Sequence, residues 1–192
     1  RTFRHMAEAK HLAFSVELSD DLPVAMVTDS TRLQQILKNL LSNAFKFTAH
    51  GGVALRIAPA QSGWSPENAS LAQADMVLAF SVTDSGVGIA SDKLQLIFEA
   101  FQQADGSTAR KYGGTGLGLS ISRELARLLR GEIRVQSEVN AGSTFTLYLP
   151  FQRGGAAVLA GVAGGAGAGA PRLAAPGEAE PEPAAPLATP AW

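Results

Sequence analysis

Three stretches of the sequence place glycine or polar residues where they could hold an anion, a metal ion or an amino group. The first is residues 111–122, KYGGTGLGLSIS, in which four glycines crowd the start of a pattern typical of an amphipathic helix. Glycine costs up to about 1 kcal/mol relative to alanine inside a helix, so glycines at this place need a reason. Backbone N–H groups can approach an anion closely there, and the helix dipole favours negative charge. The stretch predicts a phosphate-binding site at the N-terminus of a helix. The alternative is a flexible loop followed by a helix whose first turn is destabilised by glycine.

Two familiar phosphate-binding motifs do not match this spacing. A GxxxxGK[ST] loop needs lysine after its last glycine, but Leu119 and Ser120 follow Gly118. A GxGxxG fingerprint needs a third glycine, which is missing both after GTG (114–116) and after GVG (86–88). The predicted phosphate-binding site therefore belongs to neither motif and would depend only on backbone amides at a helix N-terminus.

The second stretch is a predicted helix over 29–48, DSTRLQQILKNLLSNAFKFT, with a capping Asp/Ser/Thr start and leucines at helical spacing. Successive residues advance by about 100°, so Asn39, Asn43 and Lys46 lie on one stripe beside the apolar face. Amide oxygens can ligate Mg²⁺, and the lysine ammonium could meet a phosphate. The alternative is a solvated helix flank, with Lys46 interacting with the negative end of the helix dipole.

The third stretch is SVTDSGVGIA (81–90), in which a strand delivers Asp84 into a turn that contains Gly86 and Gly88. A carboxylate at a strand end that faces a cavity is an acceptor for an amino group such as the exocyclic amine of adenine. An aspartate that merely caps a turn is the alternative.

The remaining patterns supply the elements that position these stretches. Alternating apolar residues predict strands over 13–19, 53–57, 76–84, 132–138 and 143–150, the first of them half-buried through Phe14, Val16 and Leu18. Residues 58–75 are rich in Gly, Pro and Asn and are expected to be an irregular loop. A short helix is expected to carry Leu94, Ile97, Phe98 and Phe101 on one face. A helix over 115–130, stopped by Gly131, is expected to bury Leu117, Ile121, Leu125, Leu128 and Leu129.

Together these elements predict an α/β protein: a two-layer α/β sandwich whose mixed, mostly antiparallel sheet is covered on one face by helices.

The amino-acid composition limits which partners and which cellular compartment we expect for the chain. The 192 residues carry 16 basic and 17 acidic side chains, a net charge of −1, so we expect no nucleic-acid partner. Cysteine is absent, which excludes disulfides and thiolate chemistry. The uncharged run 154–170 consists mostly of small residues and is short for a membrane span, and no secretory signal opens the chain. We expect a cytoplasmic segment without membrane contact, from a parent protein that could itself be membrane-anchored.

Taken in order, the motifs resemble the ATP-binding catalytic domain of sensor histidine kinases, within the Bergerat-fold ATPases that include gyrase, Hsp90 and MutL. LQQILKNLLSNAFKFT is similar to the N box, DSGVGI to the first glycine box, IFEAFQQ to the F box, YGGTGLGLSIS to the second glycine box and NAGSTFTLYLP to the final box. Five ordered motifs make a chance match very improbable.

The resemblance implies ATP and Mg²⁺ as ligands and gives each residue a role. Asn39 and Asn43 would hold Mg²⁺, Lys46 would touch phosphate, and Asp84 would bind the adenine amine in a pocket shaped by Gly86 and Gly88. The lid would include Arg110, Lys111 and Tyr112, with Phe98 and Phe101 beneath it unless they are simply core residues. The phosphates would be held by the amides of Gly114, Thr115, Gly116, Leu117, Gly118 and Leu119.

Within the superfamily, the sequence favours the kinases. Hydrolysing members carry a general-base glutamate where this chain has Asn39, so phosphoryl transfer to a histidine is expected. The alternatives are a gyrase-, Hsp90- or MutL-like ATPase and a catalytically silent nucleotide-sensing module. His5, His11 and His50 lack the context of a phosphoacceptor, so the acceptor histidine is expected on a dimerisation domain outside this sequence.

The same resemblance gives a domain plan. We expect residues 1–12 to be the end of a truncated dimerisation-domain helix, 13–152 the catalytic domain, and 153–192 a disordered Ala/Gly/Pro-rich linker. Such a tether is typical of hybrid kinases, so a response-regulator receiver domain is the expected second partner.

Overall fold

The computed structural model describes residues 2–99 and 117–151, within a compact unit that spans residues 1–155. In chain order the elements are α1 (Thr2–Lys10), β1 (Ala13–Leu18), α2 (Ser30–Phe47), β2 (Gly52–Ala60), α3 (Ala69–Ala72), β3 (Met76–Asp84), two short 3₁₀ helices (Ser91–Lys93 and Leu96–Phe98), α5 (Gly118–Leu128), β4 (Glu132–Glu138) and β5 (Gly142–Phe151).

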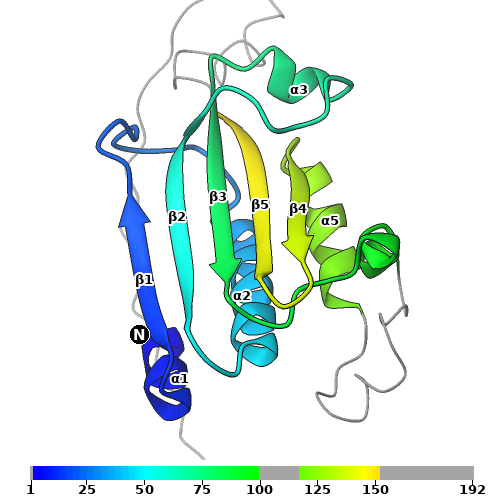
Figure 1. The fold of residues 1–192 in the computed structure, drawn as a ribbon. Helices are drawn as coiled ribbons and strands as arrows, with labels where there is room; N and C mark the ends of the chain where they lie inside the picture. Colours follow the sequence, from blue (N-terminus) through cyan, green and yellow to red (C-terminus); the bar gives the residue numbers. More distant parts are fainter. Residues whose placement is uncertain (1, 100–116, 152–192) are drawn as a thin grey trace, which may run out of the picture. The chain divides into compact units, whose positions relative to one another are not determined.

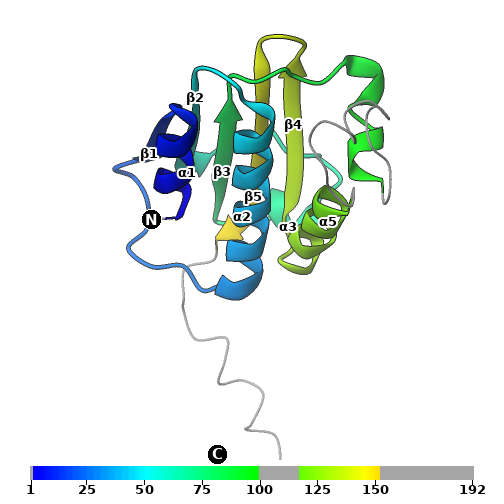
Figure 2. The same ribbon diagram turned by 90° about the horizontal axis from the view of Figure 1, so that it is seen from below.

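The five strands form one sheet in the order β1-β2-β3-β5-β4 (Figure 1). β1 and β2 are parallel, whereas the β2–β3, β3–β5 and β5–β4 pairs are antiparallel. Helices α1, α2 and α5 cover one face of the sheet (Figure 2). The predicted two-layer sandwich with a mixed, mostly antiparallel sheet is confirmed.

Side chains alternate between the two faces, as the strand period requires. On β5, Phe145, Leu147, Leu149 and Phe151 are buried on the helix side. On the other face hydroxyl groups meet across strands, Ser81 with Thr146 at 3.1 Å and Thr83 with Thr144 at 3.0 Å. The apolar core therefore lies between the sheet and the helices.

Helix α2 is the central element of the helical layer, and it follows its sequence signals closely. Asp29 caps it by accepting a hydrogen bond from the Arg32 amide at 3.0 Å. Its buried residues recur at helical spacing and are Ile36, Leu40, Leu41, Ala44 and Phe45. Because this face is fixed against the sheet, the polar stripe beside it is fixed as well.

Helix α1 packs against the C-terminal end of α2. The Phe3 and Phe45 rings stack with centroids 5.9 Å apart, and Lys10 Nζ donates to the Phe45 carbonyl at 2.5 Å. Within the described ranges, none of the helices combines the length and apolar character needed to cross a membrane.

The predicted buried face of α5 was partly wrong. Ser122 and Ala126 are its buried residues, and Leu125 and Leu129 are partly buried, but Ile121 and Leu128 are exposed. The small side chains of Ser122 and Ala126 allow α5 to lie close to its neighbours, so the contact face is rotated toward them. The helix begins at Gly118 and ends at Leu128, shorter than the predicted range 115–130.

Three other local predictions were also wrong. The β1 side chains Val16 and Leu18 are exposed because β1 is an edge strand. Residues 58–60 belong to β2, since β1 ends opposite Ile57 and Pro59 then needs to donate no hydrogen bond on that side. Residues 69–72 of the expected loop form α3, whose first turn is capped by Asn68.

The short helix expected around Leu94 is also different. Its described part consists of two 3₁₀ turns, in which Ile97 and Phe98 are buried, and Phe101 lies outside the described residues. The Phe98 ring packs edge-on against Phe145 at 6.4 Å. For Phe98, core packing is therefore observed.

Candidate functional site

The polar stripe of α2 meets the start of α5. Asn39 Nδ2 donates to Ser122 Oγ at 2.9 Å, across 83 positions of the sequence. A Cβ on Gly118 would overlap Asn39 Oδ1, so any larger residue at this place would push the Asn39 amide out of its observed position. Helix packing thus brings Asn39, at one end of the predicted metal-binding stripe of α2, against Gly118 at the start of α5.

Asn43 and Lys46 follow Asn39 along the same face of α2, at intervals of about one turn, and all three are half-buried. The Lys46 ammonium lies 5.0 Å from the centre of the Phe47 ring. The described residues contain no group of three or more His, Cys, Asp or Glu side chains that could hold a metal ion. A divalent ion at this stripe would therefore depend on amide oxygens and on the oxygens of a bound ligand.

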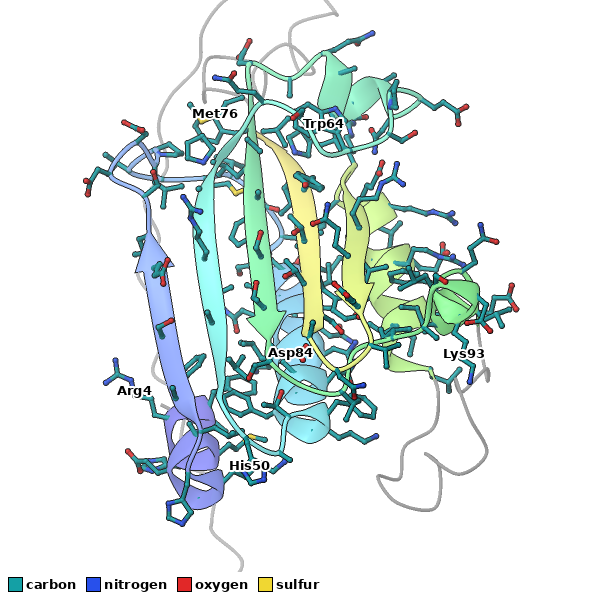
Figure 3. All side chains as sticks on the ribbon, viewed as in Figure 1. Arg4, His50, Trp64, Met76, Asp84 and Lys93 are labelled. Atoms are coloured by element: carbon teal, nitrogen blue, oxygen red, sulfur yellow. The ribbon has the colours of Figure 1, made fainter. Side chains whose placement is uncertain are left out.

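Asp84 is a buried carboxylate at the end of β3, with 7 % of its surface exposed. Figure 3 shows it beside the C-terminal half of α2. Its Oδ1 accepts a hydrogen bond from the Gly86 amide at 2.8 Å. Burial raises the pKa of Asp84, and hydrogen bonds from the Gly86 and Ser143 amides and the Thr48 side chain partly oppose that shift.

The turn after β3 is held against two other segments. The Val87 amide donates to the Phe47 carbonyl at 3.3 Å, and a Cβ on Gly86 would overlap the same carbonyl. Gly88 has a left-handed backbone, φ 69°, and lies against the Glu138 carbonyl. Both glycines are therefore needed for the turn to lie between α2 and the β4–β5 connection, which fixes the position of Asp84.

The start of α5 has no side-chain cap. Leu117 lies at the cap position, and its carbonyl accepts from the Ser120 hydroxyl at 2.9 Å and from the Ile121 amide at 2.9 Å. The amides of the first turn have no partner within the helix, so they are the groups that an anion would meet.

Six predicted site residues lie outside the described residues: Arg110, Lys111, Tyr112, Gly114, Thr115 and Gly116. Of the predicted phosphate-binding segment, the structure describes Leu117, Gly118 and Leu119, all half-buried.

The family profile for histidine kinase-, DNA gyrase B- and HSP90-like ATPases matches residues 28–153, about two thirds of the chain. The chain belongs to this family. All of the described polar groups above, on α2, after β3 and at the start of α5, lie within the matched range of this ATPase domain.

Similar proteins include sensor kinases and hybrid histidine kinases. The domain is 43% identical over 149 residues to hybrid signal transduction histidine kinase K of Dictyostelium discoideum, covering 77% of this chain and 12% of that protein. It is 40% identical over 152 residues to the autoinducer 2 sensor kinase/phosphatase LuxQ of Vibrio vulnificus, covering 79% of this chain and 17% of that protein. The chain thus spans less than a fifth of the length of these relatives.

Solved structures agree with this assignment. Full-length ShkA in complex with AMPPNP is 33% identical, with a TM-score of 0.60 over 80% of this chain and 30% of that one. The nucleotide-free catalytic domain of histidine kinase ThkA shares the fold, with 24% identity and a TM-score of 0.56 over 78% of this chain and 86% of that one. The predicted resemblance is confirmed: this is the ATP-binding catalytic domain of the histidine kinase type.

Three further residues of the ATPase domain, not singled out from the sequence, support the predicted ones. Thr48 is 1% exposed, and its hydroxyl donates to the Ala44 carbonyl at 2.7 Å beside Asp84; Ser143 supplies an amide to the same carboxylate. Ser122 orients Asn39. The sequence offered a signal for Ser122, because it follows Gly118 by one helical turn and so lies on the same face of α5. It offered none for Thr48 and Ser143, whose contacts with Asp84 depend on how the strands pack against α2.

Proposed function

We propose that the domain binds Mg²⁺-ATP between α2, the turn after β3 and the start of α5, and transfers the γ-phosphoryl group to a histidine. The observation that carries the proposal is the arrangement around α2. Asn39 lies against the uncapped start of α5, while the buried Asp84 lies beside the C-terminal half of the same helix. Groups suited to phosphate and to an amine are therefore held at two fixed places.

Asp84 would accept the adenine amine, and the raised pKa that burial causes does not remove the acceptor, because a protonated carboxyl keeps a carbonyl oxygen. Gly86 and Gly88 would shape the pocket by holding the turn. The amides from Gly114 to Leu119 would hold the phosphates, and Arg110, Lys111 and Tyr112 would belong to the lid. These roles rest on the family resemblance together with the contacts of the described residues.

The donor set of the α2 stripe fits a hard cation. Asn39 Nδ2 is engaged by Ser122, which leaves Oδ1 as an acceptor, and Asn43 offers a second amide one turn later. Asn39 and Asn43 would hold Mg²⁺, which when bound would neutralise charge on the phosphates. Lys46 would add a positive charge to the same stripe.

In the proposed reaction an imidazole nitrogen of the acceptor attacks the γ-phosphorus, the bond to the bridging oxygen breaks, and ADP leaves. Such a transfer depends on alignment and charge neutralisation more than on covalent participation by the protein. The histidine would come from a dimerisation domain, and a receiver aspartate would take the group next. The hybrid kinases among the relatives support both partners as domains of one longer protein.

Calorimetry with ATP, with and without Mg²⁺, tests the binding site. We expect Asp84→Asn to weaken ATP binding about tenfold or more, because a charge-assisted hydrogen bond is worth about 1.5–3 kcal/mol. Asn43→Ala should remove most of the dependence on Mg²⁺ while leaving some nucleotide binding. Gln34→Ala, exposed on another face of α2, is the matched control. Equal affinity of all four proteins would contradict the proposal.

A second experiment tests the reaction. The chain is mixed with γ-labelled ATP and a purified dimerisation domain that carries an acceptor histidine, and acid-labile label on that domain is measured. Transfer supports the kinase. Steady phosphate release by the chain alone, without transfer, would instead favour a hydrolysing ATPase, and binding without either product would favour a nucleotide-sensing module.

A further inference from the structure

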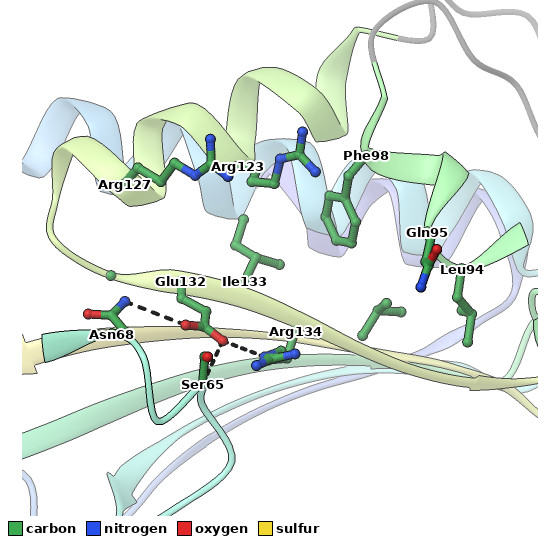
Figure 4. Close-up of a pocket in the computed structure, with 12 residues that line it drawn as sticks. Ser65, Asn68, Leu94, Gln95, Phe98, Arg123, Arg127, Glu132, Ile133 and Arg134 are labelled. Carbon is green, nitrogen blue, oxygen red and sulfur yellow. Dashed lines mark hydrogen bonds and ion pairs between the residues drawn. The ribbon is translucent and has the colours of Figure 1, made fainter. Parts of the chain in front are cut away.

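A hollow of about 520 Å³ lies along β4, the edge strand that neighbours α5 (Figure 4). Its lining includes five consecutive residues, 131–135, which are Gly131 and the first four residues of that strand. Successive strand side chains point to opposite faces, so a hollow that touches all five must follow the main chain of the edge. On the helix side it is bounded by Phe98, Arg123 and Arg127, and on the other side by Ser65 and Asn68.

The main chain of this edge is available for pairing. In the described part of the chain, β4 has one strand neighbour, β5, and residues 132–135 make no backbone hydrogen bond to any other segment. The amide of Gly131, just before the strand, is already engaged by the Ala126 carbonyl at 2.8 Å. The residues along the hollow extend over about 13 Å of strand. That length matches roughly five residues of an added extended segment, in a groove between an edge strand and a helix.

The charged groups that line the hollow are three arginines and one glutamate. The glutamate, Glu132, is already engaged: it pairs with Arg134 and accepts from the Ser65 amide at 2.9 Å and from Asn68 at 3.5 Å. Its carboxylate is turned toward the Ser65 loop, away from α5 (Figure 4). The helix side of the groove is left with positive charge.

That positive charge comes from Arg123 and Arg127. Arg127 pairs with Glu124 at 2.9 Å, but both side chains are more than half exposed, so the pair is weak. Arg123 lies over the Phe98 ring at 5.7 Å, and its buried Nε has no hydrogen-bond partner among the described residues. A buried N–H without a partner is costly. Arg123 also lines the hollow, where the positive charge of its guanidinium favours an incoming acceptor group.

From these contacts we infer that the groove along β4 is a docking site for an extended, acidic peptide segment of a partner protein. The segment adds to the sheet beside residues 132–135, and carboxylates on alternate residues face Arg123 and Arg127. The main-chain bonds supply affinity, and the alternate carboxylates supply selectivity. This docking site is separate from the proposed nucleotide site, which lies on the side of α5 where Ser122 contacts Asn39 of α2.

The test uses the full chain and a fluorescent eight-residue peptide in which glutamate alternates with threonine, followed by fluorescence anisotropy. One comparison peptide carries lysine in place of glutamate, and another is N-methylated at alternate residues, which removes main-chain donors but keeps every charge. We expect the glutamate peptide to bind and the N-methylated peptide to bind about tenfold more weakly, because several hydrogen bonds are lost. The lysine peptide should bind most weakly.

The protein variants test the groove itself. R123Q/R127Q is expected to weaken binding of the glutamate peptide about fivefold, as the loss of two partly exposed ion pairs allows. Arg56→Gln, an exposed arginine on β2, is the matched control and should bind as the parent does. Thermal midpoints of the variants should match that of the parent, which checks that the variants are folded.

Amide hydrogen exchange adds a readout of position, since pairing should slow exchange on the outer edge of residues 132–135. Absence of binding, equal binding of the N-methylated peptide, or protection confined to other segments would each overturn the inference.

Discussion

At the scale of single residues, Asp84 combines the proposed role in nucleotide binding with a cost in stability. Burial raises its pKa in the folded chain above the value in the unfolded chain. Its ionisation therefore opposes folding: stability from this group is fully present below the unfolded pKa and is lost as pH rises through the folded pKa. A carboxylate at such a place does not serve folding, which is consistent with the ligand-binding role proposed for Asp84.

Asp84→Asn tests this cost. The variant removes the ionisation and keeps an oxygen that can accept from the Gly86 amide. We expect the variant to be more stable relative to the parent at pH 7 than at pH 4, that is, its free energy of unfolding minus that of the parent should be larger at pH 7. Urea denaturation at the two pH values measures both differences. An identical difference at both values would show that ionisation of Asp84 has no influence on folding.

Gly118 is a second residue whose replacement separates function from folding. In Gly118→Ala the new methyl group would displace the Asn39 amide, since the two overlap. Alanine also favours a helix by up to about 1 kcal/mol over glycine. We therefore expect Mg²⁺-ATP affinity to fall about tenfold with little loss of thermal stability. Ser120→Ala, two positions later in the same helix, is the control for a general effect on α5; equal affinity of Gly118→Ala and the parent would contradict the assigned contact.

At the scale of elements, the contact between α1 and α2 couples the first helix to the helix of the polar stripe. Lys10 donates to the Phe45 carbonyl in the last turn of α2, where a cation is favourable. Lys10→Met should lower the free energy of unfolding by about 1 kcal/mol, because one charge-assisted bond is lost. Urea denaturation measures this, with Arg4→Met on an exposed position of α1 as control. Equal losses in the two variants would argue against the contact.

The connection from α5 to β4 depends on close backbone packing. The left-handed residue after α5 is Arg130, φ 60°, and Gly131 lies against the Tyr148 carbonyl of β5. Gly131→Ala should cost about 1–3 kcal/mol of stability, because backbone on both sides must move. Chemical denaturation checks this, and a neutral outcome would show that the strand can shift freely.

At the scale of the whole molecule, the proposed ligand would join elements that are far apart in the sequence. Asn39, Asp84 and Gly118 belong to α2, β3 and α5, so nucleotide would stabilise the folded state as a unit. At a hundredfold excess over its dissociation constant, Mg²⁺-ATP should add about 2.7 kcal/mol, a rise in melting temperature of roughly 5–10 °C. Differential scanning calorimetry measures it. No shift at saturating ligand, or an equal shift in Asp84→Asn, would contradict the site.

Much of this architecture could be predicted because local signals and tertiary packing agree. The Asp29 cap and the leucines of α2 act within the helix, so its bounds and buried face followed from the sequence. The exposure of Ile121 and Leu128 could not be predicted, because helical periodicity identifies an apolar stripe but not which part of it a neighbouring element covers. Pro59 was likewise read as a strand breaker, although a strand without a partner on one side tolerates proline.

The sequence by itself determined the family, the order of the elements and the chemical types available at the site, because motif spacing and residue type are local properties. Only the tertiary structure decided that Asn39 faces Gly118 and Ser122, that Asp84 is buried, and that Arg123 lies beside an open strand edge. Those relations join residues separated by tens of positions. They depend on how helices and strands pack, which no local pattern encodes.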